Sequence, residues 1–324
     1  MTERKKPEVV AREVWSPALL DHACNAAHLG RVECSHRCSM GPSHAVYRIS
    51  TTRGLFAIRV GLVDGEGEAW KRQARFARLR VAPRHLHEGT AVLGKQVCSY
   101  SISQWLDGRR LDYRRDLRRL AATLASLHRR TRGQKIAPSD AGEIGDYLQR
   151  QLSSHAGRRA DGGGVKERLR RAAATELAAL GQAHNADWSF RCLVHNDLVR
   201  QNIIIVADRA RLIDWEWAMN AHPALDLCGF LSPFVTSWEE ELALSDRAIA
   251  IFLKRYLEPF NRSDARRIIR GLIYAWRGYN AMVANWLYYQ SPILKPHFRQ
   301  GGFYQRAFAR SEAICTQIQK VAAG

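Results

Sequence analysis

Three residues in the second half of the chain have the side-chain types that phosphoryl transfer requires. Asp197 is followed by Asn202 five residues later, and Asp214 comes after a pattern typical of a short hairpin. Phosphoryl transfer needs one carboxylate that orients the attacking hydroxyl and accepts its proton. It also needs an amide oxygen and a second carboxylate that hold Mg²⁺ on the nucleotide phosphates. We therefore expect Asp197 to be the catalytic base, and Asn202 and Asp214 to hold the metal.

The plainer alternative is that Asp197 and Asn202 are turn residues and that Asp214 ends a strand. His195 adds a fourth matched feature, and all four residues are flanked by apolar residues typical of strands. A turn and a strand end need no such combination, so the catalytic interpretation is favoured.

The same segment resembles the signature of a known superfamily. His-Asn-Asp at 195–197 with Asn202, followed by Ile-Asp-Trp-Glu at 213–216, is similar to the aminoglycoside phosphotransferases and choline kinases. Leu-Ala-Ser-Leu-His at 124–128 is similar to a helix of that superfamily, and the resemblance covers roughly residues 30–290. The Asn of the first motif and the Asp-Trp-Glu favour the choline kinase branch, although Asp-Trp-Glu also occurs in thiamine kinase-like relatives.

The resemblance implies an α+β, protein-kinase-like fold with two lobes. A small antiparallel-sheet lobe over residues 1–103 would bind the nucleotide. A larger, mainly helical lobe over residues 104–324 would carry the catalytic and acceptor-binding residues.

The hydrophobic patterns predict elements that agree with this division. In the first hundred residues they indicate helices at 16–28 and 66–80, and strands at 46–50, 55–60, 92–93 and 96–102. Further on they indicate a helix marked by Leu117, Leu120, Leu124 and Leu127, a helix at 165–182, strands at 192–195, 203–206 and 211–213, and helices after about 240.

The resemblance also implies nucleotide-binding residues in the first lobe. Gly41 and Ser43 lie in the turn expected to cover the phosphates, Arg59 is the expected phosphate-binding cation, and Gln104 would offer its backbone to adenine. The turn has a single glycine, and Pro42 removes one N–H donor from it. By itself the turn therefore carries no weight as evidence.

A glutamate of the following helix is expected to pair with Arg59. We favour Glu68 over Glu66 because of its spacing to Pro83. The alternative for both is an ordinary solvated helix face.

The acceptor pocket is expected in the helical lobe, where Trp276, Tyr279 and Trp286 resemble a segment that encloses a quaternary ammonium in choline kinases. Cation–π attraction would supply the binding energy. The three aromatics also follow a helical stripe, so packing in the core is an equal alternative. Glu216 would be a counter-charge for a cationic acceptor, or else a group that supports Asp214 or Arg59.

Two further residues are expected to support the catalytic loop. The resemblance implies that Asp226 bonds the backbone of this loop. His195 would hold the loop by packing, because Asp197 already fills the role of the base.

The formal net charge of +19 raises the question of an anionic partner. Of the 50 basic residues 41 are arginine, spread along the chain with dense pairs between 109 and 130. We expect these pairs to form a solvated helix face, and we expect neither nucleic-acid binding nor membrane insertion. The oligomeric state does not follow from the sequence.

Seven scattered cysteines favour a reducing compartment, and the basic N-terminal segment lacks the apolar stretch of a secretory signal, so a cytoplasmic protein is expected. Cys34, His36 and Cys38 match no zinc-site spacing. Thiols buried in a strand are the favoured interpretation.

Together these observations predict an ATP- and Mg²⁺-dependent kinase that phosphorylates a hydroxyl of a small cationic amino alcohol, with choline or ethanolamine as the leading acceptors. Thiamine and aminoglycosides are cationic alcohols too and remain alternatives. A second alternative is a catalytically inactive, basic binding protein with the same fold.

Overall fold

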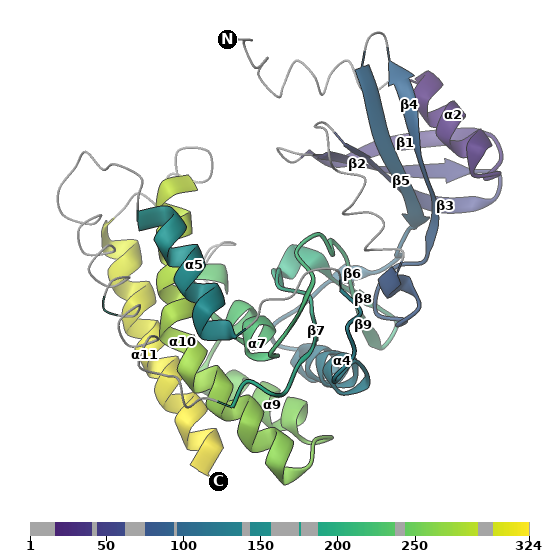
Figure 1. The fold of residues 1–324 in the computed structure, drawn as a ribbon. Coiled ribbons are helices and arrows are strands. Elements are labelled where there is room, and N and C mark those ends of the chain that lie inside the picture. The colour runs from purple at the N-terminus through teal and green to yellow at the C-terminus, as the bar shows by residue number, and fades with distance from the viewer. Residues whose placement is uncertain are drawn as a thin grey trace. The chain divides into compact units, whose positions relative to one another are not determined.

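The chain divides into two units, one built on an antiparallel sheet and the other mainly helical (Figure 1). The computed structural model describes residues 17–40, 44–61, 75–93, 96–137, 143–156, 175, 187–236, 244–290 and 301–323. Unit 1 comprises residues 1–109 with 211–216, and unit 2 comprises 110–210 with 217–324. The return of 211–216 to unit 1 is not part of the division expected from the sequence.

Unit 1 is built on a five-stranded antiparallel sheet with the strand order β1-β2-β3-β5-β4. Its elements are α2 (Pro17–Ala26), β1 (Val32–Met40), β2 (His44–Thr51), β3 (Gly54–Gly61), β4 (His85–Leu93) and β5 (Gln96–Gln104). Alternation along β2 turns Tyr47 and Ile49 toward a core that also holds Ile58 of β3 and Leu20 of α2. Arg59 lies on the opposite face of β3, and in the strand register it is opposite Ser101 of β5.

The predicted helix at 16–28 and the predicted strands are confirmed, and the strand expected around Cys34 and Cys38 is β1, but the bounds of β1 and most of β4 were missed. Both are the edge strands of the sheet. An edge strand has only one neighbour, and β1 also carries register shifts that interrupt regular alternation. The expectation of buried thiols is wrong for Cys34 and Cys38, which are exposed on β1.

Unit 2 is mainly helical, and together the two units confirm the α+β class. Its helices are α4 (Leu117–Arg130), α5 (Ile144–Ala156), α7 (Ala224–Leu231), α8 (Pro233–Thr236), α9 (Asp246–Leu257), α10 (Arg262–Gln290) and α11 (Gly301–Ala323). The long helix α10 packs against α5, α7 and α11, while α4 packs against α9 (Figure 1). The leucines that predicted α4 are all buried, as expected.

Short strands frame the segment that carries the sequence motif. β7 (Cys192–Val194) pairs with β10 (Met219–Ala221), and β6 (Arg109–Arg110), β8 (Ile203–Val206) and β9 (Arg209–Leu212) form a three-stranded sheet in the order β6-β8-β9. The predicted strands at 192–195, 203–206 and 211–213 are thus confirmed to within two residues. The predicted helix at 165–182 and most of that at 66–80 lie outside the described residues.

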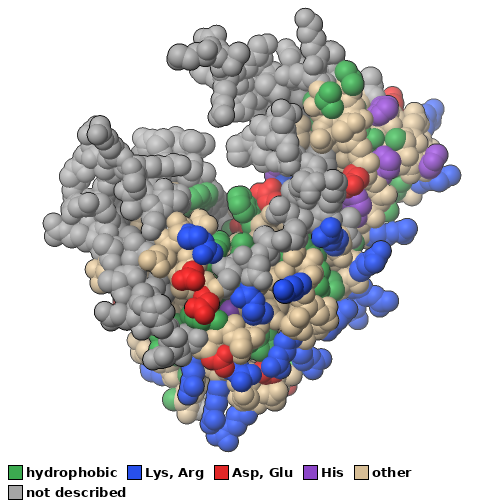
Figure 2. All heavy atoms as spheres, viewed as in Figure 1, with side chains coloured by type: hydrophobic (Ala, Val, Ile, Leu, Met, Phe, Trp, Pro, Cys, Tyr) green, Lys and Arg blue, Asp and Glu red, His purple; other side chains and the backbone are tan. Residues whose placement is uncertain are grey.

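The arginine pairs between 109 and 130 are largely solvated, although not as one helix face. Residues 118–119 and 129–130 lie on α4, whereas 109–110 form β6 and 114–115 precede α4. Figure 2 shows many more Lys and Arg than Asp and Glu side chains on the face that it displays. Among the described helices, none has both the length and the apolar character needed to cross a bilayer.

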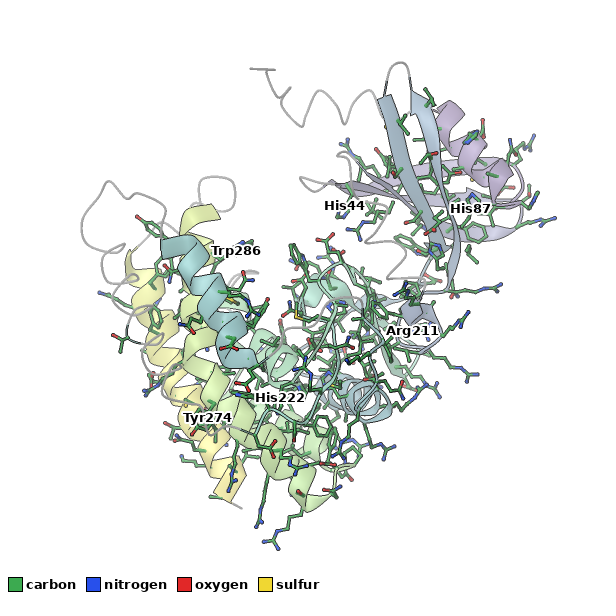
Figure 3. All side chains as sticks on the ribbon, in the orientation of Figure 1. His44, His87, Arg211, His222, Tyr274 and Trp286 are labelled. Atoms are coloured by element: carbon green, nitrogen blue, oxygen red, sulfur yellow. The ribbon has the colours of Figure 1, made fainter. Side chains whose placement is uncertain are left out.

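His222 is a buried histidine in the aromatic core of unit 2. Trp188 packs edge-on against its ring, and its Nδ1 accepts a hydrogen bond from the Ala224 N–H at 3.2 Å (Figure 3). Gly271 lies directly against the imidazole, so that a Cβ there would approach both ring nitrogens to 2.8 Å. Burial, and then the neighbouring His128, lower the pKa of His222 to about 3. The ring is therefore neutral at physiological pH.

This lowered pKa predicts a loss of stability in mild acid. Below about pH 6.5 the unfolded chain protonates His222 while the folded chain does not, so stability falls as the pH drops toward 3. The loss from this residue is roughly 2 kcal/mol at pH 5. Urea unfolding of His222→Gln should show a correspondingly smaller difference between pH 7.5 and pH 5. The exposed His36→Gln is the control, and identical pH profiles for both variants would contradict the assignment.

Candidate functional site

Residues 195–202, which the sequence predicts to be the catalytic loop and which are called the catalytic-loop segment below, are anchored in unit 2 by a buried carboxylate. Asp226 lies in the first turn of α7 with its side chain fully buried. Its Oδ2 accepts the His195 N–H at 2.9 Å and its Oδ1 accepts the Asn196 N–H at 2.7 Å. These are the backbone contacts that the resemblance led us to expect. His195 itself is buried, as a packing role requires.

A histidine and a tyrosine complete the surroundings of this carboxylate. His128 Nε2 of α4 lies 3.0 Å from Asp226 Oδ2, and its Nδ1 lies 2.8 Å from the Tyr256 hydroxyl of α9. Burial raises the pKa of Tyr256 well above its usual value, so that the phenol stays protonated. A buried carboxylate is costly unless it is hydrogen-bonded, and Asp226 meets that requirement with two backbone N–H groups and a ring nitrogen.

Asp197 and Asn202 meet within the same loop. The Asn202 Nδ2 donates to Asp197 Oδ2 at 2.8 Å and to the Asp197 carbonyl oxygen at 3.1 Å. Because the amide nitrogen donates to Asp197, the amide oxygen is the atom that remains to ligate a cation. Hard cations such as Mg²⁺ prefer oxygen ligands, so this donor set fits the predicted metal.

Arg59 is the centre of a charged cluster in unit 1. Its Nη1 donates to Asp214 Oδ1 at 2.8 Å, and its Nη2 donates to Glu216 Oε2 at 2.7 Å. The arginine side chain is 10% exposed, and the two carboxylates are only partly exposed, at 26% and 23%. Such sheltered ion pairs are screened less by salt than surface pairs.

His44 of β2 supplies a third partner for this guanidinium (Figure 3). Its Nδ1 lies 2.9 Å from Arg59 Nη2. Burial, and then the charge of Arg59, lower the pKa of His44 to about 4, against an opposing effect of Asp214. A neutral imidazole can accept the guanidinium N–H, so His44 helps to orient Arg59. The sequence did not predict this contact, because the partner of His44 lies on another strand.

The segment that carries Asp214 is tied to unit 1 by packing. The Trp215 ring lies 5.0 Å from that of Phe76, and its indole N–H donates to the Leu212 carbonyl oxygen at 2.8 Å. The Leu212 N–H in turn donates to the Val81 carbonyl oxygen at 2.7 Å. These contacts hold Asp214 and Glu216 on the same unit as Arg59. Among the described residues no three His, Cys, Asp or Glu side chains group into a metal site, so a cation would need ligands of other types as well.

The remaining nucleotide-binding candidates are only partly placed. The Gln104 N–H donates to the Arg84 carbonyl oxygen at 2.8 Å, so that this donor is not open to a ligand. Gly41, Ser43, Glu66 and Glu68 lie outside the described residues.

The aromatic candidates of α10 differ in exposure. Trp276 is fully buried and its indole N–H donates to the Ser311 carbonyl oxygen of α11 at 2.9 Å, a placement that fits the packing alternative. Tyr279 is also buried, beside Gly229 of α7. Trp286 is 40% exposed (Figure 3).

Tyr147 of α5 is a contact that the sequence analysis missed. Its hydroxyl accepts a hydrogen bond from Asn196 Nδ2 at 3.3 Å, which brings α5 to the catalytic loop. Burial raises the pKa of Tyr147. No local pattern marks this tyrosine, since its partner lies 49 residues further along the chain.

The anchoring of the loop predicts the effect of Asp226→Asn. In the wild-type chain both oxygens of Asp226 accept backbone N–H groups. The asparagine would replace one of these oxygens by an NH₂ group, so one hydrogen bond is lost and two donors face each other. We expect a loss of about 1.5–3 kcal/mol in the free energy of unfolding, measured by urea denaturation. The control is Asp208→Asn, a carboxylate that is 89% exposed and pairs with Arg119. Equal effects of the two substitutions would contradict the anchoring role.

Solved structures of known proteins share this fold. An aminoglycoside phosphotransferase from Alicyclobacillus acidocaldarius is 15% identical with a TM-score of 0.63, and the match covers 89% of this chain and 92% of that one. A choline/ethanolamine kinase family protein from Mesorhizobium loti is 17% identical with a TM-score of 0.59, covering 98% and 99%. Spectinomycin phosphotransferase APH(9)-Ia, solved with ADP and spectinomycin, is 11% identical with a TM-score of 0.62, covering 94% and 99%. The expected kinase-like fold is thereby confirmed.

No curated protein sequence matches the chain. The model of the phosphotransferase enzyme family matches residues 42–267, a span that includes Arg59, the catalytic-loop segment, Asp214 and Asp226. This chain is a member of the phosphotransferase enzyme family.

Proposed function

We propose that the chain is an ATP- and Mg²⁺-dependent kinase that transfers the γ-phosphoryl group to a hydroxyl of a small cationic amino alcohol, with choline or ethanolamine as the leading acceptors. The observation that carries the proposal is the Asn202–Asp197 bond in a loop whose backbone Asp226 fixes. It joins the Asn202 amide nitrogen to the Asp197 carboxylate and leaves the amide oxygen as the atom that could ligate a cation. The ADP in the similar spectinomycin phosphotransferase structure supports the use of a nucleotide.

In this proposal Asp197 orients the acceptor hydroxyl and takes its proton on a carboxylate oxygen. Asn202 and Asp214 hold Mg²⁺ through oxygen atoms, and Arg59 binds the phosphates with the guanidinium that His44 and Glu216 orient. Mg²⁺, when bound, neutralises charge on the transferred group. Because little covalent chemistry falls to the protein, its contribution is mainly positioning and charge stabilisation. Tyr279 and Trp286 remain the candidates for acceptor contact.

The Asp197 carboxylate favours a cationic acceptor although the whole chain is basic, whereas Asp214 and Glu216 are paired with Arg59. At physiological ionic strength, exposed charges beyond about 8 Å are largely screened. Thiamine and aminoglycosides satisfy the same argument and belong in the test. The seven cysteines are all free, which supports a reducing compartment such as the cytoplasm.

The proposal predicts ADP release from Mg²⁺-ATP in the presence of choline or ethanolamine. Asp197→Ala should lower the rate by about 10²–10⁴-fold, because the hydroxyl loses its base. Asp208→Ala, which removes an exposed carboxylate, is the matched control and should leave the rate unchanged. Turnover with thiamine or kanamycin only would keep the mechanism and reject the acceptor. Failure to bind ATP would favour the inactive binding protein.

The contact between Glu216 and Arg59 predicts that Glu216 contributes to the binding of ATP and not to the binding of the acceptor. Because Glu216 orients the phosphate-binding guanidinium, Glu216→Gln should raise the KM for ATP several-fold and leave the KM for the acceptor nearly unchanged. Steady-state kinetics with each substrate varied separately measure both. Glu88→Gln, an exposed glutamate on β4, is the control. A rise confined to the KM for the acceptor would show that Glu216 is the counter-charge of the cationic substrate.

A further inference from the structure

A hollow of unit 2 has the features of a binding site. It is open to solvent, has a volume of about 740 Å³ and lies at the beginnings of α4 and α9. That volume is within the range of about 300–1,000 Å³ that small-molecule sites occupy. None of the residues assigned above to phosphoryl transfer lines it.

Positive charge surrounds this hollow. Arg114, Arg115, Arg118 and Arg247 line it, and no described carboxylate does. Of the four, only Arg115 has a carboxylate partner among the described residues, the Asp112 side chain at 3.6 Å. The site therefore offers at least three guanidinium groups to an anion.

The acidic residues at the two helix starts are already engaged elsewhere. Asp116 Oδ1 accepts from Arg119 Nη1 at 2.9 Å, and its Oδ2 accepts the Asp112 N–H at 2.9 Å. Asp246 Oδ1 accepts from Arg310 Nη1 at 2.8 Å. Each of these carboxylates is thus paired with an arginine that does not line the hollow.

The position of these arginines is electrostatically unfavourable without a ligand. Helix N-termini carry a partial positive charge and favour anions. Arg114 and Arg115 precede α4, while Arg118 and Arg247 lie in the first turns of α4 and α9. Cations placed at two helix N-termini gain nothing from the helices, so a bound anion would relieve the repulsion.

The lining of the hollow is otherwise apolar. It consists of Tyr113, Leu117, Leu244, Ala248 and Ile251, with Ser245 as the remaining polar residue. Tyr113 is a fixed part of it, because its ring packs against that of Phe230 at 5.9 Å. A concave site with apolar walls and charged rim groups suits a small molecule with an apolar body. A nucleic acid backbone, in contrast, is hydrophilic and extended.

We propose that this hollow binds a small organic phosphate, whose phosphate is held by Arg114, Arg118 and Arg247 and whose apolar body contacts Leu117 and Ile251. Arginine is suited to this because its guanidinium matches the phosphate geometry with paired N–H donors. The site is independent of the proposed kinase chemistry, since it shares no residue with it.

The test is isothermal titration calorimetry of the full chain with 1-naphthyl phosphate at physiological salt. We expect one bound molecule, and binding at least about tenfold weaker for inorganic phosphate and for 1-naphthol, which each lack one half of the probe. The double variant Arg118→Gln, Arg247→Gln should bind the probe at least about tenfold more weakly. The matched control is Arg129→Gln, Arg270→Gln, which removes the same charge from exposed positions on α4 and α10.

Several outcomes would overturn the proposal. Equal loss in the two double variants would show that net charge alone attracts the probe. Equal binding by all three chains would place the probe elsewhere, and no binding would leave the hollow without this ligand. Binding of 1-naphthol as tight as that of the phosphate would reject the role of the arginines. Tighter binding of a DNA duplex, lost in the Arg118, Arg247 variant, would assign the surface to nucleic acid. Thermal melts of both variants verify that they fold.

Discussion

The buried carboxylate of Asp226 is the constraint on which unit 2 depends. It joins four parts of the chain, because the catalytic loop donates two backbone N–H groups to it, α7 carries it, and His128 of α4 links it to Tyr256 of α9. An ionised carboxylate without these partners would be strongly destabilised at this depth. The four elements are therefore held in one arrangement, and hydrogen bonds to a residue of α7 fix the backbone of the loop that carries Asp197 and Asn202.

Arg59 has a comparable role in unit 1. Its two terminal nitrogens contact Asp214, Glu216 and His44, and these three partners lie in different directions from the guanidinium. A planar guanidinium presents several N–H groups in fixed directions, whereas a lysine ammonium is a flexible point charge. The arginine at this position thus explains why a neutral histidine and a second carboxylate accompany Asp214.

The sequence predicted features formed by residues close together in the chain better than contacts between residues far apart in it. The spacing of Asp197 and Asn202 predicted that the two residues act together, and the structure joins them by a hydrogen bond within one loop. The leucines of α4 predicted a buried helix face, which is also observed. The partner of Arg59 was sought first in the next helix, and Glu216, 157 residues away, was named only as an alternative support for Asp214 or Arg59, which is the contact that the structure shows.

Other features were left open or missed, because a sequence pattern specifies neither the depth of a side chain nor its distant neighbours. The edge strands β1 and β4 both carry register shifts, which interrupt the regular apolar alternation seen in the central strands. Trp276 fits a ligand stripe and a core stripe equally well, and only the bond to Ser311 of α11 separates them. The hydrogen-bond partner of Tyr147 is Asn196, which lies in the catalytic loop and not in α5, so no pattern within the helix indicates the contact.

Two strained backbone positions lie in the motif that the sequence singled out. Among the described residues only five non-glycine residues have positive φ, and Asn196 at 62° and Asp214 at 65° are two of them. Such conformations cost on the order of 1–3 kcal/mol and persist only where the surroundings enforce them. The hydrogen bond from its N–H to Asp226 enforces the conformation of Asn196. The ion pair with Arg59 and the neighbouring buried Trp215 enforce that of Asp214. The residues that hold the strain are thus those that orient the two aspartates, so loss of Asp226 or Arg59 would release the backbone as well as the side chain.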